Sequence, residues 1–142
     1  MKTVRQLLET KGADVISVSP DSNVLDALKL MAAREIGAVL VVEAARLVGI
    51  MSERDYARKV ILKGKSSQDT KVREIMTERV MYARPDQTVP ELMALMTNKR
   101  VRHLPVLEDD HLVGVLSIGD LVKETISEQE FIIRQLENYI HG

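Results

Sequence analysis

Apolar residues follow two different spacings in the first half of the chain. From Val24 to Met31 they recur every three or four positions, which predicts an amphipathic helix. Farther on they form continuous runs, which are typical of buried strands, and two runs this close together indicate a hairpin. A short apolar stretch that ends at Pro20 predicts one more strand at the start. The elements expected here are a strand at 15–18, a helix at 24–34, strands at 38–43 and 47–51, and a helix from 53 to about 62.

The same order of patterns returns in the second half. Thr88 with Glu91 three residues on predicts a helix start, and Pro90 fits the first turn. Pro105 indicates that its strand lies at a sheet edge or bulges. The elements expected here are a strand at 80–83, a helix after Thr88, strands at 103–107 and 112–116, and a helix after Ser117. A short helix at 3–10 is expected to lead the chain.

The last segment, residues 127–140, carries a broad apolar stripe. Glu130 follows Ser127 by three residues, which is the pattern of a capping box. We therefore expect a separate C-terminal helix whose apolar face covers an edge of the core or meets a partner chain.

An internal repeat underlies this order. When the chain is shifted by 65 residues, the segment from Pro20 to Asp55 matches itself without a gap at 12 of 36 positions. Chance would give about two or three matches, so the chain contains two copies of one supersecondary unit. We expect the first repeat at residues 1–64, the second at 65–126 and a helical tail at 127–142.

One motif, Gly-x-x-Ser-x-x-Asp, stands at the same place in each repeat, at Gly49–Asp55 and Gly114–Asp120. A serine at a helix N-cap accepts a bond from a free backbone N–H, and an acid three residues on is favoured in the first turn. The unpaired N–H groups of that turn suit a phosphate, and the carboxylate can accept bonds from ribose hydroxyls. A capping box without any ligand is the alternative, but the repetition favours a binding role.

Composition narrows the functional classes. The 142 residues carry a net charge of -1 and only 3% aromatic side chains, so we expect no nucleic-acid partner. No apolar run approaches the length of a membrane span, and no cysteine is present, so we expect a cytoplasmic protein without disulfides. Three dispersed histidines lack metal-ligand spacing. No nucleophile with a positioned base and no paired carboxylates at catalytic spacing occur, so we expect no enzyme.

Two β-α-β-β-α repeats, each with this motif after an apolar hairpin, resemble a tandem cystathionine-β-synthase (CBS) domain pair, or Bateman module. Segments 52–60, 102–106 and 117–122 are similar to small stand-alone bacterial proteins of this family. The resemblance implies an α+β fold of two pseudo-symmetric repeats packed through their sheets, plus a C-terminal helix. It also implies a homodimer and a binding module for adenosine compounds: AMP, ADP, ATP, NAD or S-adenosylmethionine, with no metal required.

In the family, two clefts combine the motif of one repeat with strand residues of the other. Carried over to this sequence, the resemblance implies one cleft with Ser52, Arg54, Asp55, Arg58, Met81, Val101, Arg102 and His103, and another with Ile16, Ile36, Gly37, Ala38, Ser117, Ile118 and Asp120.

The two implied clefts differ in charge. The cleft of Asp55 carries Arg54 and Arg102, whereas Gly119 and Gly37 stand at the matching positions of the other. We therefore expect the more phosphorylated ligand at Asp55. Ligand binding would alter contact with a regulated protein that the sequence does not name. A structural dimerisation module with decayed clefts is the alternative, and a small nucleotide-converting enzyme is a third.

Overall fold

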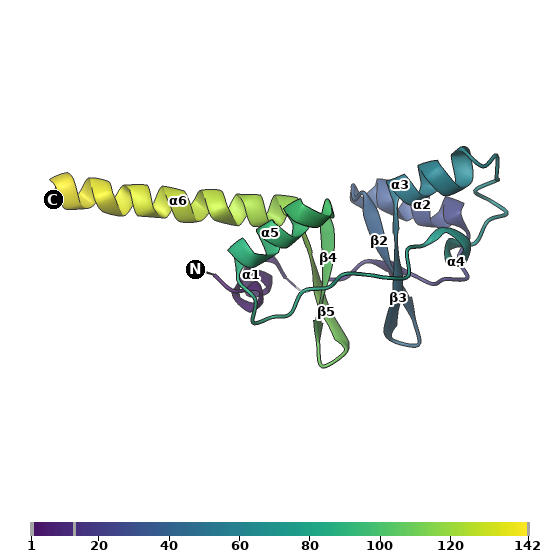
Figure 1. Cartoon of the computed structure of the whole chain (residues 1–142), viewed down its shortest axis with the longest axis horizontal. Helices are drawn as coiled ribbons and strands as arrows, with labels where there is room; N and C mark the ends of the chain where they lie inside the picture. Colours follow the sequence, from purple (N-terminus) through teal and green to yellow (C-terminus); the bar gives the residue numbers. More distant parts are fainter. Residues whose placement is uncertain (1, 13, 142) are drawn as a thin grey trace. The chain divides into compact units, whose positions relative to one another are not determined.

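The computed structural model describes residues 2–12 and 14–141, and they form two compact units (Figure 1). The first-repeat unit comprises residues 14–81 with 109–112. The second-repeat unit comprises residues 2–12, 82–108 and 113–141. The helix that begins the chain therefore belongs to the same unit as the second hairpin. The predicted α+β class is confirmed.

The first-repeat unit is built on a three-stranded sheet in the order β1–β2–β3. Strand β1 pairs parallel to β2, with Val18 opposite Val41, and β2 pairs antiparallel to β3, with Ala38 opposite Ser52. The predicted hairpin is therefore confirmed. The elements of this unit are β1 (Ser17–Val18), α2 (Val24–Arg34), β2 (Ala38–Glu43), β3 (Arg46–Ser52), α3 (Glu53–Tyr56), the π-helix η1 (Ala57–Ile61) and α4 (Val72–Ile75).

Helix α2 begins and ends on local signals. The Asn23 side chain accepts a hydrogen bond from the Asp26 N–H, which satisfies one free donor of the first turn. The helix stops at Glu35, which adopts the left-handed conformation with φ 55°. The predicted end of this helix at about Arg34 is therefore confirmed. The apolar face of α2 is buried in a core that also takes residues from β2, β3, η1 and α4.

The first hairpin turns through only two residues, Ala44 and Ala45. Both have positive φ, 52° and 65°, and Arg46 already belongs to β3, opposite Glu43. A two-residue turn with positive φ at both positions is the type whose twist matches the flanking strands. Alanine is a poor residue for it, which is why the sequence predicts this turn only weakly and one residue too long.

The helix expected from Glu53 to Leu62 changes character after one turn. Residues Glu53–Tyr56 are α-helical, and Ala57–Ile61 form a π-helix in which the Leu62 N–H donates to the Ala57 carbonyl. Such short π segments often occur near functional sites. The prediction of a single regular helix here is wrong.

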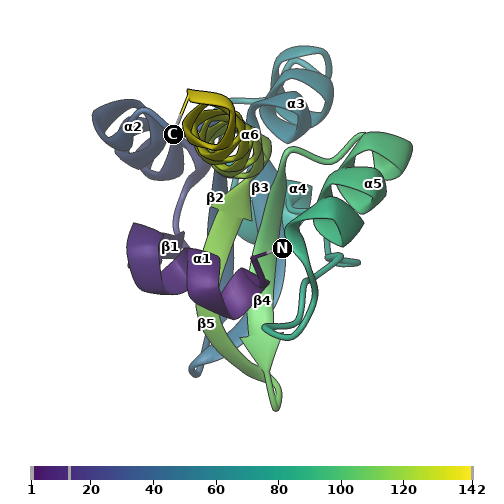
Figure 2. The ribbon, with the colours of Figure 1, turned by 90° about the vertical axis from the view of Figure 1, so that its left-hand side faces the viewer.

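The second-repeat unit has a two-stranded antiparallel sheet flanked by helices (Figure 2). Thr3 caps its first helix in a reciprocal capping box with Gln6, and the Thr88 side chain accepts from the Glu91 N–H, as predicted. Because the sheet has two strands, the strand with Pro105 is an edge strand. The elements of this unit are α1 (Val4–Lys11), α5 (Val89–Lys99), β4 (His103–Glu108), β5 (His111–Ser117) and α6 (Ile118–His141).

The strand expected at 80–83 shrinks to one parallel bridge, Ala83 opposite Val106, in the same register as Val18 and Val41. The Ala83 N–H donates to the Pro105 carbonyl at 2.8 Å. Pro105 stands where the first repeat has Leu40 and has no N–H to donate, so the ladder cannot extend past this bridge.

A single helix, α6, runs from Ile118 to His141, so the capping box expected at Ser127 is wrong. No glycine or proline interrupts residues 120–141, and the apolar spacing continues through Val122 and Ile126. The predicted C-terminal helix exists, but as the second half of the helix that begins at the motif. Figure 1 shows it extending past α5 and the β4–β5 hairpin of its unit.

Candidate functional site

The motif Gly49–Asp55 lies where β3 passes into α3. The Ser52 hydroxyl accepts from the Asp55 N–H at 3.1 Å, and the Asp55 carboxylate accepts from the Ser52 N–H at 3.0 Å. Each group satisfies the other's backbone donor, which is the reciprocal capping box predicted from the spacing. We call Ser52, Asp55, Lys59 and Thr77 the Asp55 site.

Both oxygens of the Asp55 carboxylate are engaged. Oδ2 accepts from Ser52, and the Thr77 hydroxyl donates to Oδ1 at 3.1 Å. The Lys59 ammonium lies 3.2 Å from Oδ1 and also donates to the Ile75 carbonyl. The residue is only 8% exposed. Asp55 therefore joins α3, the π-helix and the segment after α4 into one hydrogen-bonded group.

The second motif repeats the capping geometry between β5 and α6. The Ser117 hydroxyl accepts from the Asp120 N–H at 3.1 Å, and Asp120 Oδ2 accepts from the Ser117 N–H at 2.8 Å. The Lys11 ammonium donates to the same Oδ2 at 2.6 Å. Among the residues that the structure describes, none donates to Oδ1. We call Lys11, Val115, Ser117 and Asp120 the Asp120 site.

Lys11 and Ser117 lower the pKa of the Asp120 carboxyl. Partial burial by itself would raise the pKa of this carboxyl. The hydrogen bonds from Lys11 and from the Ser117 backbone and hydroxyl outweigh burial and hold the pKa of Asp120 below its ordinary value. At neutral pH the group is therefore an ionised acceptor with one open oxygen.

The glycine of each motif has a packing role. A Cβ on Gly49 would lie 2.8 Å from Met76 Sδ and 2.9 Å from the Thr77 carbonyl oxygen. A Cβ on Gly114 would lie 2.7 Å from Leu8 Cδ2. Glycine thus lets a neighbouring segment approach the strand closely, and that segment delivers Thr77 to Asp55 or Lys11 to Asp120.

Sequence reasoning missed both Thr77 and Lys11. They lie 22 and 109 residues from the aspartates they contact, and no periodicity links them. The one available signal is indirect. Val4–Leu8 resembles Val72–Met76 at a shift of 68 residues, and Lys11 and Thr77 follow these two segments.

Within each unit, the strand that starts the hairpin begins beside the motif. Ala38 pairs with Ser52, and the Glu53 N–H donates to the Gly37 carbonyl at 3.0 Å. In the second-repeat unit the Ile118 N–H donates to the Arg102 carbonyl at 2.8 Å. Within their own units, therefore, Gly37 and Ala38 lie next to the Asp55 site, and Arg102 lies next to the Asp120 site.

The remaining candidates are placed as follows. Arg54, Arg58 and Arg102 are exposed, and Ile16, Ile36, Met81, Val101, His103 and Ile118 are partly exposed. The assignment of Met81, Val101, Arg102 and His103 to Asp55, and of Ile16, Ile36, Gly37 and Ala38 to Asp120, stays a prediction.

No group of three or more histidine, cysteine, aspartate or glutamate residues within residues 2–12 and 14–141 could hold a metal ion. No helix in that part of the chain is both long and apolar enough to cross a membrane.

Comparison with known proteins gives consistent matches. The CBS domain family model matches the chain twice, at residues 4–62 and 72–127. The mitochondrial CBS domain-containing protein CBSX3 of Arabidopsis thaliana is 38% identical over 149 residues, covering 99% of this chain and 72% of its own length. The crystal structure of the CBS domain NE2398 is 51% identical with a TM-score of 0.84, covering 88% of this chain and 98% of that one.

A more distant structure shares the fold. The CBS domain pair of protein MJ0100, in complex with 5′-methylthioadenosine and S-adenosyl-L-methionine, is 23% identical with a TM-score of 0.78. It covers 90% of this chain and 98% of that chain. At that identity the likeness shows the fold alone.

Proposed function

Because the chain belongs to the CBS domain family, we propose that it is a non-catalytic regulatory module that binds an adenosine compound and signals its presence to a partner protein. The observation that carries this proposal is the Asp120 site. An ionised carboxylate with one open oxygen stands at a helix start, where it can accept a ribose hydroxyl. The expected cytoplasmic location stays a prediction, since one relative is named as mitochondrial.

The ligand class can be tested by thermal unfolding with AMP, ADP, ATP, NAD, S-adenosylmethionine and 5′-methylthioadenosine. A ligand present at a hundred times its dissociation constant adds about 2.7 kcal/mol of stability. For a chain of this length that corresponds to a rise in Tm of roughly 8 °C. GMP serves as the matched control for phosphate and ribose without adenine. If no adenosine compound raises Tm at millimolar concentration, the proposed function is wrong.

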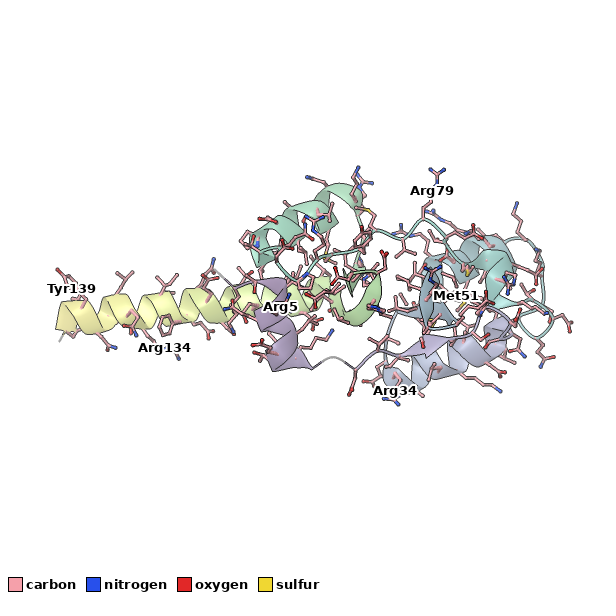
Figure 3. All side chains as sticks on the ribbon, turned by 90° about the horizontal axis from the view of Figure 1, so that it is seen from below. Arg5, Arg34, Met51, Arg79, Arg134 and Tyr139 are labelled. Carbon is pink, nitrogen blue, oxygen red and sulfur yellow. The ribbon has the colours of Figure 1, made fainter. Side chains whose placement is uncertain are left out.

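The expected homodimer has a candidate surface on α6. Several large apolar side chains on this helix are exposed, among them Ile133 at 53%, Leu136 at 57% and Tyr139 at 88%. Figure 3 shows Tyr139 near the free end of the helix, with no other element of its unit beside it. A stripe of this kind is costly to leave in water, because each buried aliphatic side chain contributes about 1.5–3 kcal/mol.

We propose that a second copy of this chain covers the stripe as an antiparallel helix. Ile126, Ile133 and Ile140 are spaced by seven, as in a coiled-coil seam. With the two-fold axis beside residue 131, Ile126 lies opposite Leu136 of the second copy. The same register brings Lys123 of one copy near Glu137 of the other at both ends of the seam, and it places Glu130 near its own counterpart at the centre. Two attractive charge pairs therefore flank one repulsive pair.

Sedimentation velocity tests this surface. The variant Ile133→Glu is expected to sediment as a monomer at concentrations where the wild type is a dimer. Arg134→Glu changes charge at the neighbouring position, which lies off the seam, and should leave the dimer intact. A monomeric wild type, or a dimer that Ile133→Glu does not weaken, would contradict the proposal.

A further inference from the structure

We propose that Lys11 is a second sugar-binding residue: its ammonium and Asp120 Oδ1 form a donor–acceptor pair for the hydroxyls of a ribose. This proposal rests on the proposed function and adds to it which of the two motif sites takes the sugar, and through which groups.

Lys11 is held in place at the Asp120 site. Its Nζ donates to the Val115 carbonyl at 2.7 Å and to Asp120 Oδ2 at 2.6 Å. An ammonium group has three N–H donors, so one remains after these two bonds. About a third of the Lys11 side chain and a quarter of the Asp120 side chain are exposed to solvent. A small polar group can therefore reach both from solvent.

The remaining donor and acceptor match a sugar hydroxyl. A hydroxyl donates one hydrogen bond and accepts others. It can donate to Asp120 Oδ1, which no described residue uses, and accept from the third N–H of Lys11. Both bonds involve a charged partner, and such bonds are shorter and stronger than bonds between neutral groups. No existing contact has to break for the hydroxyl to bind.

The Asp55 site lacks this opening. Ile50 in the first repeat corresponds to Val115 in the second. The Ile50 carbonyl accepts from the Thr77 N–H at 2.8 Å, whereas the Val115 carbonyl accepts from Lys11. The Thr77 hydroxyl also donates to Asp55. The backbone amide and the hydroxyl of Thr77 thus bond the strand carbonyl and the motif aspartate of the first repeat. In the second repeat the Lys11 ammonium alone makes both of these contacts. Asp55, 8% exposed and bonded at both oxygens, is closed by comparison.

The cation also comes from a different element in each repeat. Lys59, one turn after Asp55 on the same helical segment, pairs with Asp55. Its counterpart after a shift of 65 is Glu124, which pairs with Lys2 instead. In the second repeat the cation therefore has to come from α1. Leu8 packs over Gly114, and Lys11 follows three residues later on the same helix face.

Isothermal titration with AMP and with its 2′,3′-dideoxy analogue tests the proposal. The wild type should bind AMP at least tenfold more tightly than the analogue. Lys11→Met should weaken AMP binding by roughly tenfold and change binding of the analogue by less than about twofold. Lys11→Arg, which keeps the cation and its donors, should recover part of the preference. Lys2→Met removes the same charge from the same unit and should leave the preference unchanged.

The outcomes separate this proposal from the broader one. If neither AMP nor any other adenosine compound binds the wild type, the proposed function fails and this proposal fails with it. If AMP binds but Lys11→Met keeps the full preference for ribose, only the role of Lys11 is overturned. The same holds if Thr77→Val, rather than Lys11→Met, abolishes the preference. Should Lys11→Met not fold, as judged by circular dichroism, Lys11→Leu, which also lacks a donor, provides the same comparison.

Discussion

Replacing the two motif glycines by alanine should have unequal effects on stability. Neither glycine has positive φ, so alanine's backbone preferences fit both positions, and the difference lies in what the new Cβ meets. At Gly49 it meets the Thr77 carbonyl oxygen at 2.9 Å, and residue 77 is bonded to Ile50 through both its N–H and its carbonyl. At Gly114 the three atoms nearest to it all belong to the side chain of Leu8.

The magnitudes follow from which atoms can move. Overpacking against fixed groups costs about 1–3 kcal/mol, because the backbone has to shift. A leucine side chain can yield by twisting away from its preferred rotamer, which costs about 0.5–1.5 kcal/mol. Alanine also restricts the unfolded chain, which offsets about 0.4–1 kcal/mol in each case. We therefore expect Gly49→Ala to destabilise by roughly 1–2 kcal/mol, and Gly114→Ala by at most about 1 kcal/mol.

Urea unfolding at one fixed protein concentration measures both differences, provided that the slope of free energy against urea is unchanged. Gly119→Ala is the matched control. Its Cβ would have nothing nearer than Ser117 Oγ at 3.6 Å, and it lies in a helix, where alanine is favoured by about 1 kcal/mol. This variant should be more stable than the wild type. An unchanged Gly49→Ala, or a larger loss at Gly114 than at Gly49, would refute the packing argument.

Three further predictions concern single sites. Ala44→Asn combined with Ala45→Gly should stabilise the protein by roughly 1 kcal/mol, because both residues have positive φ; urea unfolding measures it, and a loss of stability would contradict it. The pKa of Asp120 is lowered in the folded state, so its contribution to stability is present above about pH 4 and is lost as the pH falls through the folded pKa. The stability difference between wild type and Asp120→Asn should therefore shrink in acid, and a constant difference from pH 7 to pH 3 would count against this. Thr77→Val removes a donor to Asp55 and should cost about 1 kcal/mol by urea unfolding, whereas an unchanged midpoint would show that bond to be unimportant.

Patterns carried by neighbouring residues predicted the fold well. The cap at Thr88 and the reciprocal bonds of Ser52 with Asp55 depend only on residues three apart, and the structure confirms them. The hairpins follow from continuous apolar runs. These features are local, so their spacing in the sequence is enough to define them.

Features that depend on distant partners could not be read in this way. The strand at 80–83 is limited by Pro105, which lies more than twenty residues away. The open oxygen of Asp120 depends on Lys11 at the other end of the chain. The π-helix at Ala57–Ile61 has no apolar spacing that distinguishes it from an α-helix. Which aspartate is open and which is closed is therefore a property of tertiary contacts.

The place of α1 in the second-repeat unit sets an order for folding during synthesis. Residues 14–81 contain nearly all of one unit and can begin to fold while the ribosome is still translating the rest. Helix α1 has its partners, Pro85, Gln87 and Gly114, more than seventy residues downstream. It therefore has to wait, undocked, until the second hairpin has emerged. A helix that is made before its partners is thus among the last elements of these two units to reach its native position.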